Sequence, residues 1–304
     1  MTGDPAAPDG AAGFGGFDGR AWLNCAHQGP LPRVAVAEAE RALADKAAPH
    51  RIRDEAFTEV PRRLKAALGR LVGVPADQVI LGNSTSYGLQ LLVQGVDWRP
   101  GDEVLLVAGD FPATIVPWLP LAERGVRVRL LEPEGGALDA DRLAAELTPA
   151  TRLFCTSWVF SFTGHAVDLA ALGRVCRQAG VTFVVNGSQG VGAAPLELAG
   201  LPVDALVSCG FKWLCGPYGT GFCWVRPDLL ASLAHRPAYW LSHLAQEDLG
   251  QETALRRGRL RVSPHLYNTE ADIDRALEVL DGPGGRGGSP SPAGRRPPPR
   301  ARCP

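Results

Sequence analysis

The sequence predicts an α/β fold with a mostly parallel, seven-stranded sheet that helices cover on both faces. Seven short apolar runs are typical of strands buried in such a sheet, and helical stretches separate most of them. With 304 residues and a hydrophobic content of 45%, the chain can bury the core of one large domain and of a smaller one.

The predicted elements follow one another in a regular order. Two amphipathic helices come first, and a last helix begins at Thr269, which is a suitable N-cap before an acidic first turn. The helices are expected at residues 34–48, 55–73, 84–96, 137–147, 168–180 and 269–280, and the strands at 78–82, 103–109, 126–132, 152–158, 181–185, 204–210 and 219–226.

We expect the chain to divide into four parts. Residues 1–20 form a flexible leader, 21–235 a large domain with its N-terminal segment, and 236–281 a small domain. Residues 282–304 contain mainly Gly, Pro, Arg and Ser without an apolar period, so this tail cannot bury enough surface to become ordered.

Charge and cysteine content exclude several kinds of partner. A formal net charge of −1 gives no field that would attract nucleic acid or an acidic membrane surface. No signal-peptide pattern and no uncharged apolar run of about eighteen residues is present, so we expect a cytoplasmic location. The seven cysteines are odd in number and lack CxxC spacing, which predicts free thiols and no metal site.

Lys212 differs in its setting from the other two lysines of the chain. Lys46 and Lys65 lie in amphipathic helices among charged residues, where long side chains reach water. Lys212 directly follows the apolar run 204–210 and lies between two aromatic residues. An apolar setting of this kind suits a lysine that forms a Schiff base. A lysine whose stem merely packs on aromatic rings would show the same pattern.

A cluster of hydroxyl residues lies where the first strand leads into a helix. Ser84, Thr85 and Ser86 occupy this junction, which offers free backbone N–H groups and the positive end of a helix dipole. The pattern predicts a phosphate site, although a plain N-cap has the same composition.

Polar and aromatic residues also follow two other predicted strands. Asn186 and Gln189 come directly after the apolar run 181–185, where they could meet a ligand or form an Asn-Gly turn. Phe111 follows the run 103–109 and could stack on a planar ring or belong to the core.

The order of these motifs resembles the aminotransferase class V group of pyridoxal phosphate (PLP) enzymes. Cysteine desulfurases, kynureninase and isopenicillin N epimerase-like proteins share its fold-type I architecture. The resemblance covers residues 22–227 and resumes at 259–274, and its most specific blocks are 157–172, 184–198 and 209–228. It implies a PLP-binding large domain at 21–235, a small domain truncated to 236–281, an amino-acid substrate and a homodimer.

The resemblance also implies roles for individual residues. Lys212 would be the catalytic Schiff-base lysine, while Ser84 and Thr85 would bind the phosphate and Phe111 would stack on the pyridine ring. The remaining roles are implied for Gln189 and Ser161 at the phenolic oxygen, for Arg261 at the substrate carboxylate, and for His27 where the N-terminal segment reaches the site.

The chain departs from the family pattern at several of these positions. Asn186 replaces the aspartate that keeps the pyridine nitrogen protonated, and an amide brings no negative charge. Cys209 replaces a serine, and Phe211 replaces a tyrosine or histidine donor. Only residues 229–258 precede the Arg261 segment, where the family has much more chain, including the loop with the desulfurase nucleophile.

The interpretation that follows is a PLP enzyme with epimerase-like or lyase-like chemistry on an amino acid, ranked slightly above an aminotransferase. A degenerate or truncated non-catalytic homologue is the alternative that the departures favour. A Rossmann-type oxidoreductase is excluded, because the one glycine cluster of similar form, at residues 11–19, follows no strand and precedes no helix.

Overall fold

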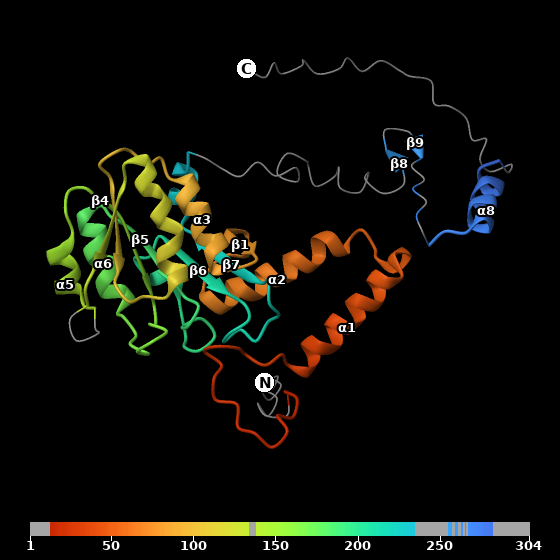
Figure 1. The fold of residues 1–304 in the computed structure, drawn as a ribbon, viewed down its shortest axis with the longest axis horizontal. Coiled ribbons are helices and arrows are strands. Elements are labelled where there is room, and N and C mark those ends of the chain that lie inside the picture. Colours follow the sequence, from red (N-terminus) through yellow and green to blue (C-terminus); the bar gives the residue numbers. More distant parts are fainter. Residues whose placement is uncertain are drawn as a thin grey trace, which may run out of the picture. The chain divides into compact units, whose positions relative to one another are not determined.

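Seven strands form one sheet in the order β1-β7-β6-β5-β4-β2-β3 (Figure 1). Strand β7 is antiparallel to both of its neighbours, and the other pairs are parallel. The predicted mostly parallel, seven-stranded sheet is therefore confirmed. The strands are β1 (Val79–Gly82), β2 (Glu103–Val107), β3 (Arg127–Leu131), β4 (Thr151–Ser157), β5 (Thr182–Asn186), β6 (Ala205–Cys209) and β7 (Gly221–Val225).

The computed structural model describes residues 13–133, 138–234, 255–256, 259–260, 263, 265 and 267–281. The chain divides into two compact units, Met1–Ala238 and Tyr239–Pro304. The large sheet belongs to the first unit. The predicted limits of the leader, the small domain and the tail stay predictions.

The six predicted helices are present, and further helical segments accompany them. Residues 112–124 form a short helix, α4, that continues into a 3₁₀ helix, η3. Three prolines interrupt any regular apolar period in this segment, so no helix is expected there from the sequence. The α-helices are α1 (Arg33–Ala47), α2 (Ala56–Val72), α3 (Thr85–Gly95), α4 (Pro112–Ile115), α5 (Ala140–Glu146), α6 (Leu169–Ala179), α7 (Pro227–Ser232) and α8 (Glu270–Asp281); the 3₁₀ helices are η1 (Pro49–Arg51), η2 (Ala76–Gln78), η3 (Val116–Arg124) and η4 (Leu198–Gly200).

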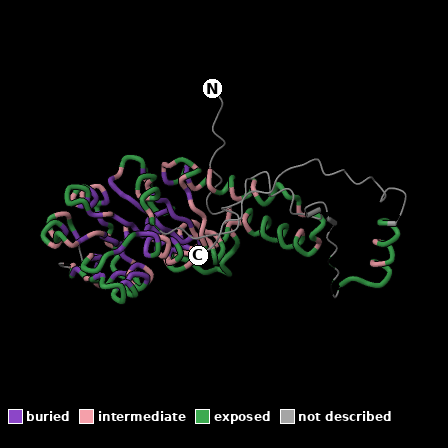
Figure 2. The backbone as a smooth tube through the Cα atoms, turned by 90° about the horizontal axis from the view of Figure 1, so that it is seen from above, coloured by how far each residue is buried: buried purple, intermediate pink, exposed green. Residues whose placement is uncertain are grey.

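The core consists of two layers, one on each face of the sheet. Alternate residues of β2 enter different layers, since Leu105 packs in one and Leu106 in the other. Helix α6 contributes Leu172 to the first layer, and α3 contributes Leu89 and Leu92 to the second. Figure 2 shows the buried backbone concentrated in this part of the chain. Burial on both faces explains why the central strands are largely apolar, whereas the edge strand β3 has exposed positions.

The parallel strands β4, β5 and β6 bring polar residues to one edge of the sheet. Ser157 at the end of β4 pairs with Asn186 at the end of β5, and Asn186 pairs with Val207 of β6. The carboxyl ends of these strands therefore lie side by side, which is where ligands bind in open α/β sheets.

In the second unit, the predicted helix and its cap are present. The backbone N–H of Asp272 donates to Thr269 Oγ1 (3.2 Å), and the N–H of Thr269 donates to Asp272 Oδ2 (2.9 Å). Leu255–Arg256 (β8) and Arg259–Leu260 (β9) form a two-stranded antiparallel sheet. Within the described residues, no helix has the length and apolar character needed to cross a membrane.

Candidate functional site

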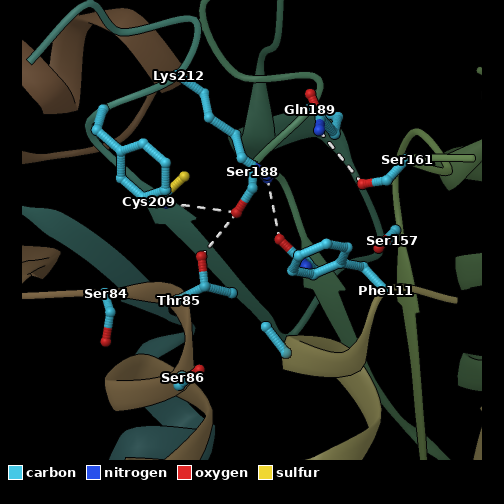
Figure 3. A pocket seen from close by; sticks show the side chains of 13 residues that line it. Ser84, Thr85, Ser86, Phe111, Ser157, Ser161, Ser188, Gln189, Cys209 and Lys212 are labelled. Atoms are coloured by element: carbon cyan, nitrogen blue, oxygen red, sulfur yellow. Dashed lines mark hydrogen bonds between the residues drawn. The ribbon is translucent and has the colours of Figure 1, made fainter. Parts of the chain in front are cut away.

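A pocket at the carboxyl edge of the sheet collects most of the predicted site residues. They come from the N-terminus of α3, the start of α4 and the segments that follow β4, β5 and β6 (Figure 3). Every predicted cofactor-binding residue lines it. The lining residues are Ser84, Thr85, Ser86, Phe111, Ala113, Ser157, Ser161, Asn186, Ser188, Gln189, Cys209, Phe211 and Lys212.

Lys212 is buried, with a relative exposure of 9%. Its Nζ lies 5.0 Å from the centroid of the Phe111 ring and 5.9 Å from that of Phe211. Phe111 is 36% exposed, so it is a pocket residue and not part of the core. The amine thus lies against an aromatic surface that is open toward a ligand.

Hydroxyl groups converge below the lysine, as Figure 3 shows. Thr85 Oγ1 and Ser188 Oγ are 2.7 Å apart, and the backbone N–H of Cys209 donates to Ser188 Oγ (3.4 Å). Ser84 Oγ accepts from the N–H of Tyr87 (3.1 Å) and is therefore the N-cap of α3. The sequence left both an N-cap and a phosphate site open for this junction, and the cap is observed.

Asn186 is buried with both ends of its amide occupied. Its Oδ1 accepts from the N–H of Ser188 (3.0 Å), and its Nδ2 donates to Thr114 Oγ1 (2.8 Å). Because the Ser188 N–H must face an acceptor, the orientation of the amide is chemically defined.

Gln189 connects three segments of the site. Its Oε1 accepts from Trp213 Nε1 (2.8 Å), and its Nε2 donates to the carbonyl of Ala26 (3.0 Å) and to Ser161 Oγ (3.2 Å). The N-terminal segment, the segment after β4 and the lysine loop are thereby held together. Gln189 and Ser161 are therefore neighbours in the pocket, and their predicted role at a phenolic oxygen stays a prediction.

Asp110 was not predicted from the sequence. It is only 4% exposed and accepts from Ser157 Oγ (2.6 Å), from the N–H of Ser157 (2.8 Å) and from the N–H of Phe111 (2.6 Å). Burial raises the pKa of Asp110 above its usual value, although these hydrogen bonds oppose the shift. Its position between a strand end and Phe111 was the one available signal.

One predicted substrate-binding residue does not line the pocket, and the other is not among the described residues. His27 is exposed and does not line it, although the preceding residue, Ala26, is bonded to Gln189. Arg261 lies outside the described residues. Both assignments stay predictions. Among the residues that the structure describes, no group of three or more His, Cys, Asp or Glu could hold a metal ion.

Curated proteins similar to this chain include two kinds of enzyme. An isopenicillin N epimerase from Streptomyces clavuligerus is 30% identical over 263 residues, covering 84% of this chain and 65% of the relative. A probable cysteine desulfurase from Methanothermobacter thermautotrophicus is 28% identical over 176 residues, covering 57% of this chain and 44% of the relative. The chain thus spans less than two thirds of the length of these relatives.

Solved structures with a similar fold include the cystine C-S lyase C-DES. Its complex with the reaction product cysteine persulfide has a TM-score of 0.68 and 29% sequence identity, covering 73% of this chain and 61% of that chain. A lysine-to-alanine variant with glycine covalently linked to the PLP cofactor has a TM-score of 0.69 and 28% identity, covering 77% and 63%. The predicted fold-type I architecture is confirmed.

The sequence model of the aminotransferase class-V family matches residues 31–256, which include the sheet and every residue that lines the pocket. This match confirms the family predicted from the motifs. The chain belongs to the aminotransferase class-V family.

Proposed function

We propose that this chain binds PLP through Lys212 and acts on an amino acid by epimerase-like or lyase-like chemistry. The observation that carries the proposal is the setting of Lys212, whose amine is buried beside the open ring of Phe111. An amine held beside a ring face in the pocket would meet the aldehyde of a planar cofactor stacked on that ring. The amine would condense with the aldehyde of PLP and release one water.

The other lining residues fit the rest of this cofactor. Thr85 and Ser188 offer hydroxyls beside the N-terminus of α3, which suits a phosphate group. Phe111 offers a ring face for stacking, and Asn186 offers a buried amide for a ring nitrogen. Gln189 donates to Ser161 Oγ, and the Ser161 hydroxyl would in turn donate to the phenolic oxygen.

When bound, PLP acts as an electron sink for charge that develops at the substrate Cα. Lys212 is the group that would remove or return a proton there, because it is the amine closest to the stacking ring in the described residues. Asn186 brings no negative charge to stabilise a protonated ring, so charge that develops at Cα would be stabilised less in epimerisation, elimination and transamination alike.

Four of the six cysteines in the described residues argue against a persulfide-forming desulfurase. Cys176 and Cys223 are buried, which raises the pKa of each thiol to about 12. Burial also raises the pKa of Cys155, and that of Cys215 is raised by burial and by the neighbouring Cys25. Thiols held in the protonated form are poor nucleophiles. A C–S lyase or an epimerase needs no such group.

A non-catalytic homologue is the second candidate. Asn186 favours it, since the amide lacks the charge of the usual aspartate, and so does Phe211, which offers no donor. The two candidates differ in what they predict for added amino acids, because a non-catalytic protein could bind PLP without changing any substrate.

The substrate and assembly belong to the same proposal. Arg261 would receive the substrate carboxylate, and His27 would reach the substrate from the N-terminal segment, in a cytoplasmic homodimer. Exposed apolar side chains on α1 and α2, among them Val34, Leu43 and Phe57, support an interface between subunits. Light scattering of the purified chain would report its mass and test the dimer.

An absorbance titration with PLP tests the binding step. We expect the wild-type chain to develop a visible band on addition of PLP and Lys212→Ala to develop none. Lys65→Ala is the matched control, since Lys65 lies on α2 and does not line the pocket. A wild type without the band would contradict the proposal. Amino acids added to the loaded protein, with product detection, then separate the enzyme from the non-catalytic homologue.

A further inference from the structure

Asp110 ends a chain of hydrogen bonds that begins at the pocket. Asn186 Nδ2 lies 2.8 Å from Thr114 Oγ1, Thr114 Oγ1 lies 3.2 Å from Ser157 Oγ, and Ser157 Oγ lies 2.6 Å from Asp110 Oδ1. All four residues are buried. Two of them, Asn186 and Ser157, line the pocket, while Asp110 and Thr114 lie behind it.

The donors and acceptors of these groups give the series of hydrogen bonds a direction. An ionised Asp110 can only accept hydrogen bonds, so Ser157 must donate its one hydroxyl hydrogen to it. Ser157 Oγ can then only accept from Thr114, and Thr114 Oγ1 can only accept from Asn186. Every hydrogen therefore points from the amide toward the carboxylate.

This direction of the hydrogen bonds affects the amide of Asn186, which lines the pocket. An amide whose N–H donates into a chain that ends on a negative charge becomes a stronger acceptor at its oxygen, because hydrogen bonds in series polarise one another. The N–H of Ser188 holds the Oδ1 end of Asn186, and the chain holds the Nδ2 end. Both the orientation and the polarity of Asn186 thus depend on groups behind the pocket.

We propose that Asp110 is a positioning residue that acts through Ser157 and Thr114 to orient and polarise the Asn186 amide toward the bound ring. The inference rests on the proposed function, since the ring is that of PLP. It assigns to Asp110 part of the negative character that Asn186 itself lacks.

A purely structural role for Asp110 is the competing account. The N–H groups of Phe111 and Ser157 would need an acceptor in any case, and Asp110 supplies it. Ser157→Ala separates the two accounts, because it removes the hydroxyl link and keeps the backbone N–H that bonds Asp110.

The test is PLP binding to the purified full-length chain, measured by dissociation constant and by absorbance maximum. We expect Asp110→Asn and Ser157→Ala each to weaken binding by about tenfold and to shift the maximum in the same direction. Asp204→Asn is the matched control, because Asp204 is also buried and accepts from a backbone N–H, that of Phe183 (2.7 Å), but does not line the pocket.

The pathway through Asn186 is tested in a second background. When Asn186→Asp supplies its own charge, Asp110→Asn should have little further effect on affinity or spectrum. Ser157→Ala that binds and absorbs like wild type would overturn the inference, as would an equal effect of Asp110→Asn in both backgrounds. A wild type that binds no PLP would overturn the proposed function as well, so the two failures are distinguishable.

Discussion

Replacing Gly29 with alanine should loosen the N-terminal segment from the lysine loop. A Cβ at this position would lie 1.9 Å from the carbonyl oxygen of Lys212 and 3.0 Å from Cys215 Sγ. The N–H of Gly29 also donates to the carbonyl of Phe211 (2.9 Å). Because the first clash is with backbone, a side-chain rotation cannot relieve it, and the two segments must separate.

The expected cost combines two effects. Overpacking costs about 1–3 kcal/mol, and loss of the Gly29 hydrogen bond costs about 0.5–1.5 kcal/mol, which gives about 1.5–4.5 kcal/mol together. If the N-terminal segment detaches from the lysine loop, the clash is relieved and the cost is smaller. Urea unfolding measures the loss of stability, and amide hydrogen exchange over residues 22–31 measures the detachment.

Gly200→Ala is the control, since no atom lies within 4 Å of a Cβ built at Gly200. It should change the free energy of unfolding by less than about 0.5 kcal/mol. The packing argument is refuted if Gly29→Ala matches this control in both unfolding and exchange.

Two further predictions concern buried polar groups. Glu103 is buried, and although burial raises its pKa, hydrogen bonds from Arg129 and Thr151 with the arginine charge lower it overall. A pKa that is lower in the folded than in the unfolded chain stabilises the fold at every pH above the unfolded-state pKa of about 4.3. This stabilisation is lost as the pH falls through the folded-state pKa. Glu103→Gln should therefore lower the free energy of unfolding by about 1–3 kcal/mol at pH 7. Between pH 7 and pH 3, urea unfolding should show a smaller loss of stability for the variant than for wild type. Equal losses would contradict the role of the Glu103 carboxylate. Gln189→Leu should cost about 1–3 kcal/mol and speed hydrogen exchange in residues 22–31, because it leaves Trp213 and Ala26 without their partner; unchanged exchange would contradict that link.

The strand positions could be predicted because burial on both faces makes the central strands largely apolar. Strand β2 contains the apolar run 104–107 and β5 the apolar run 183–185. Helix α4 and η3 could not be predicted, since their prolines hide the helical period and their position depends on packing, as Trp118 lies fully buried in one core layer.

The sequence predicted those residues of the candidate site that belong to recognisable motifs. Lys212 and Asn186 each lie at a strand end, and strand ends meet at one edge of a parallel sheet. Asp110 and Ser157 were missed because a carboxylate and a hydroxyl after an apolar run are usually turn residues. Their connection to Asn186 depends on the register between β4 and β5, which the sequence does not display.

Identification of the lysine that carries PLP is the most direct test of the proposed function. The chain has three lysines, at positions 46, 65 and 212, so a reduced adduct can be assigned without ambiguity. Incubation with PLP, reduction with borohydride and peptide mass spectrometry should place the adduct on Lys212 and leave Lys46 and Lys65 unmodified. An adduct confined to Lys46 or Lys65, or no adduct at all, would contradict the proposal.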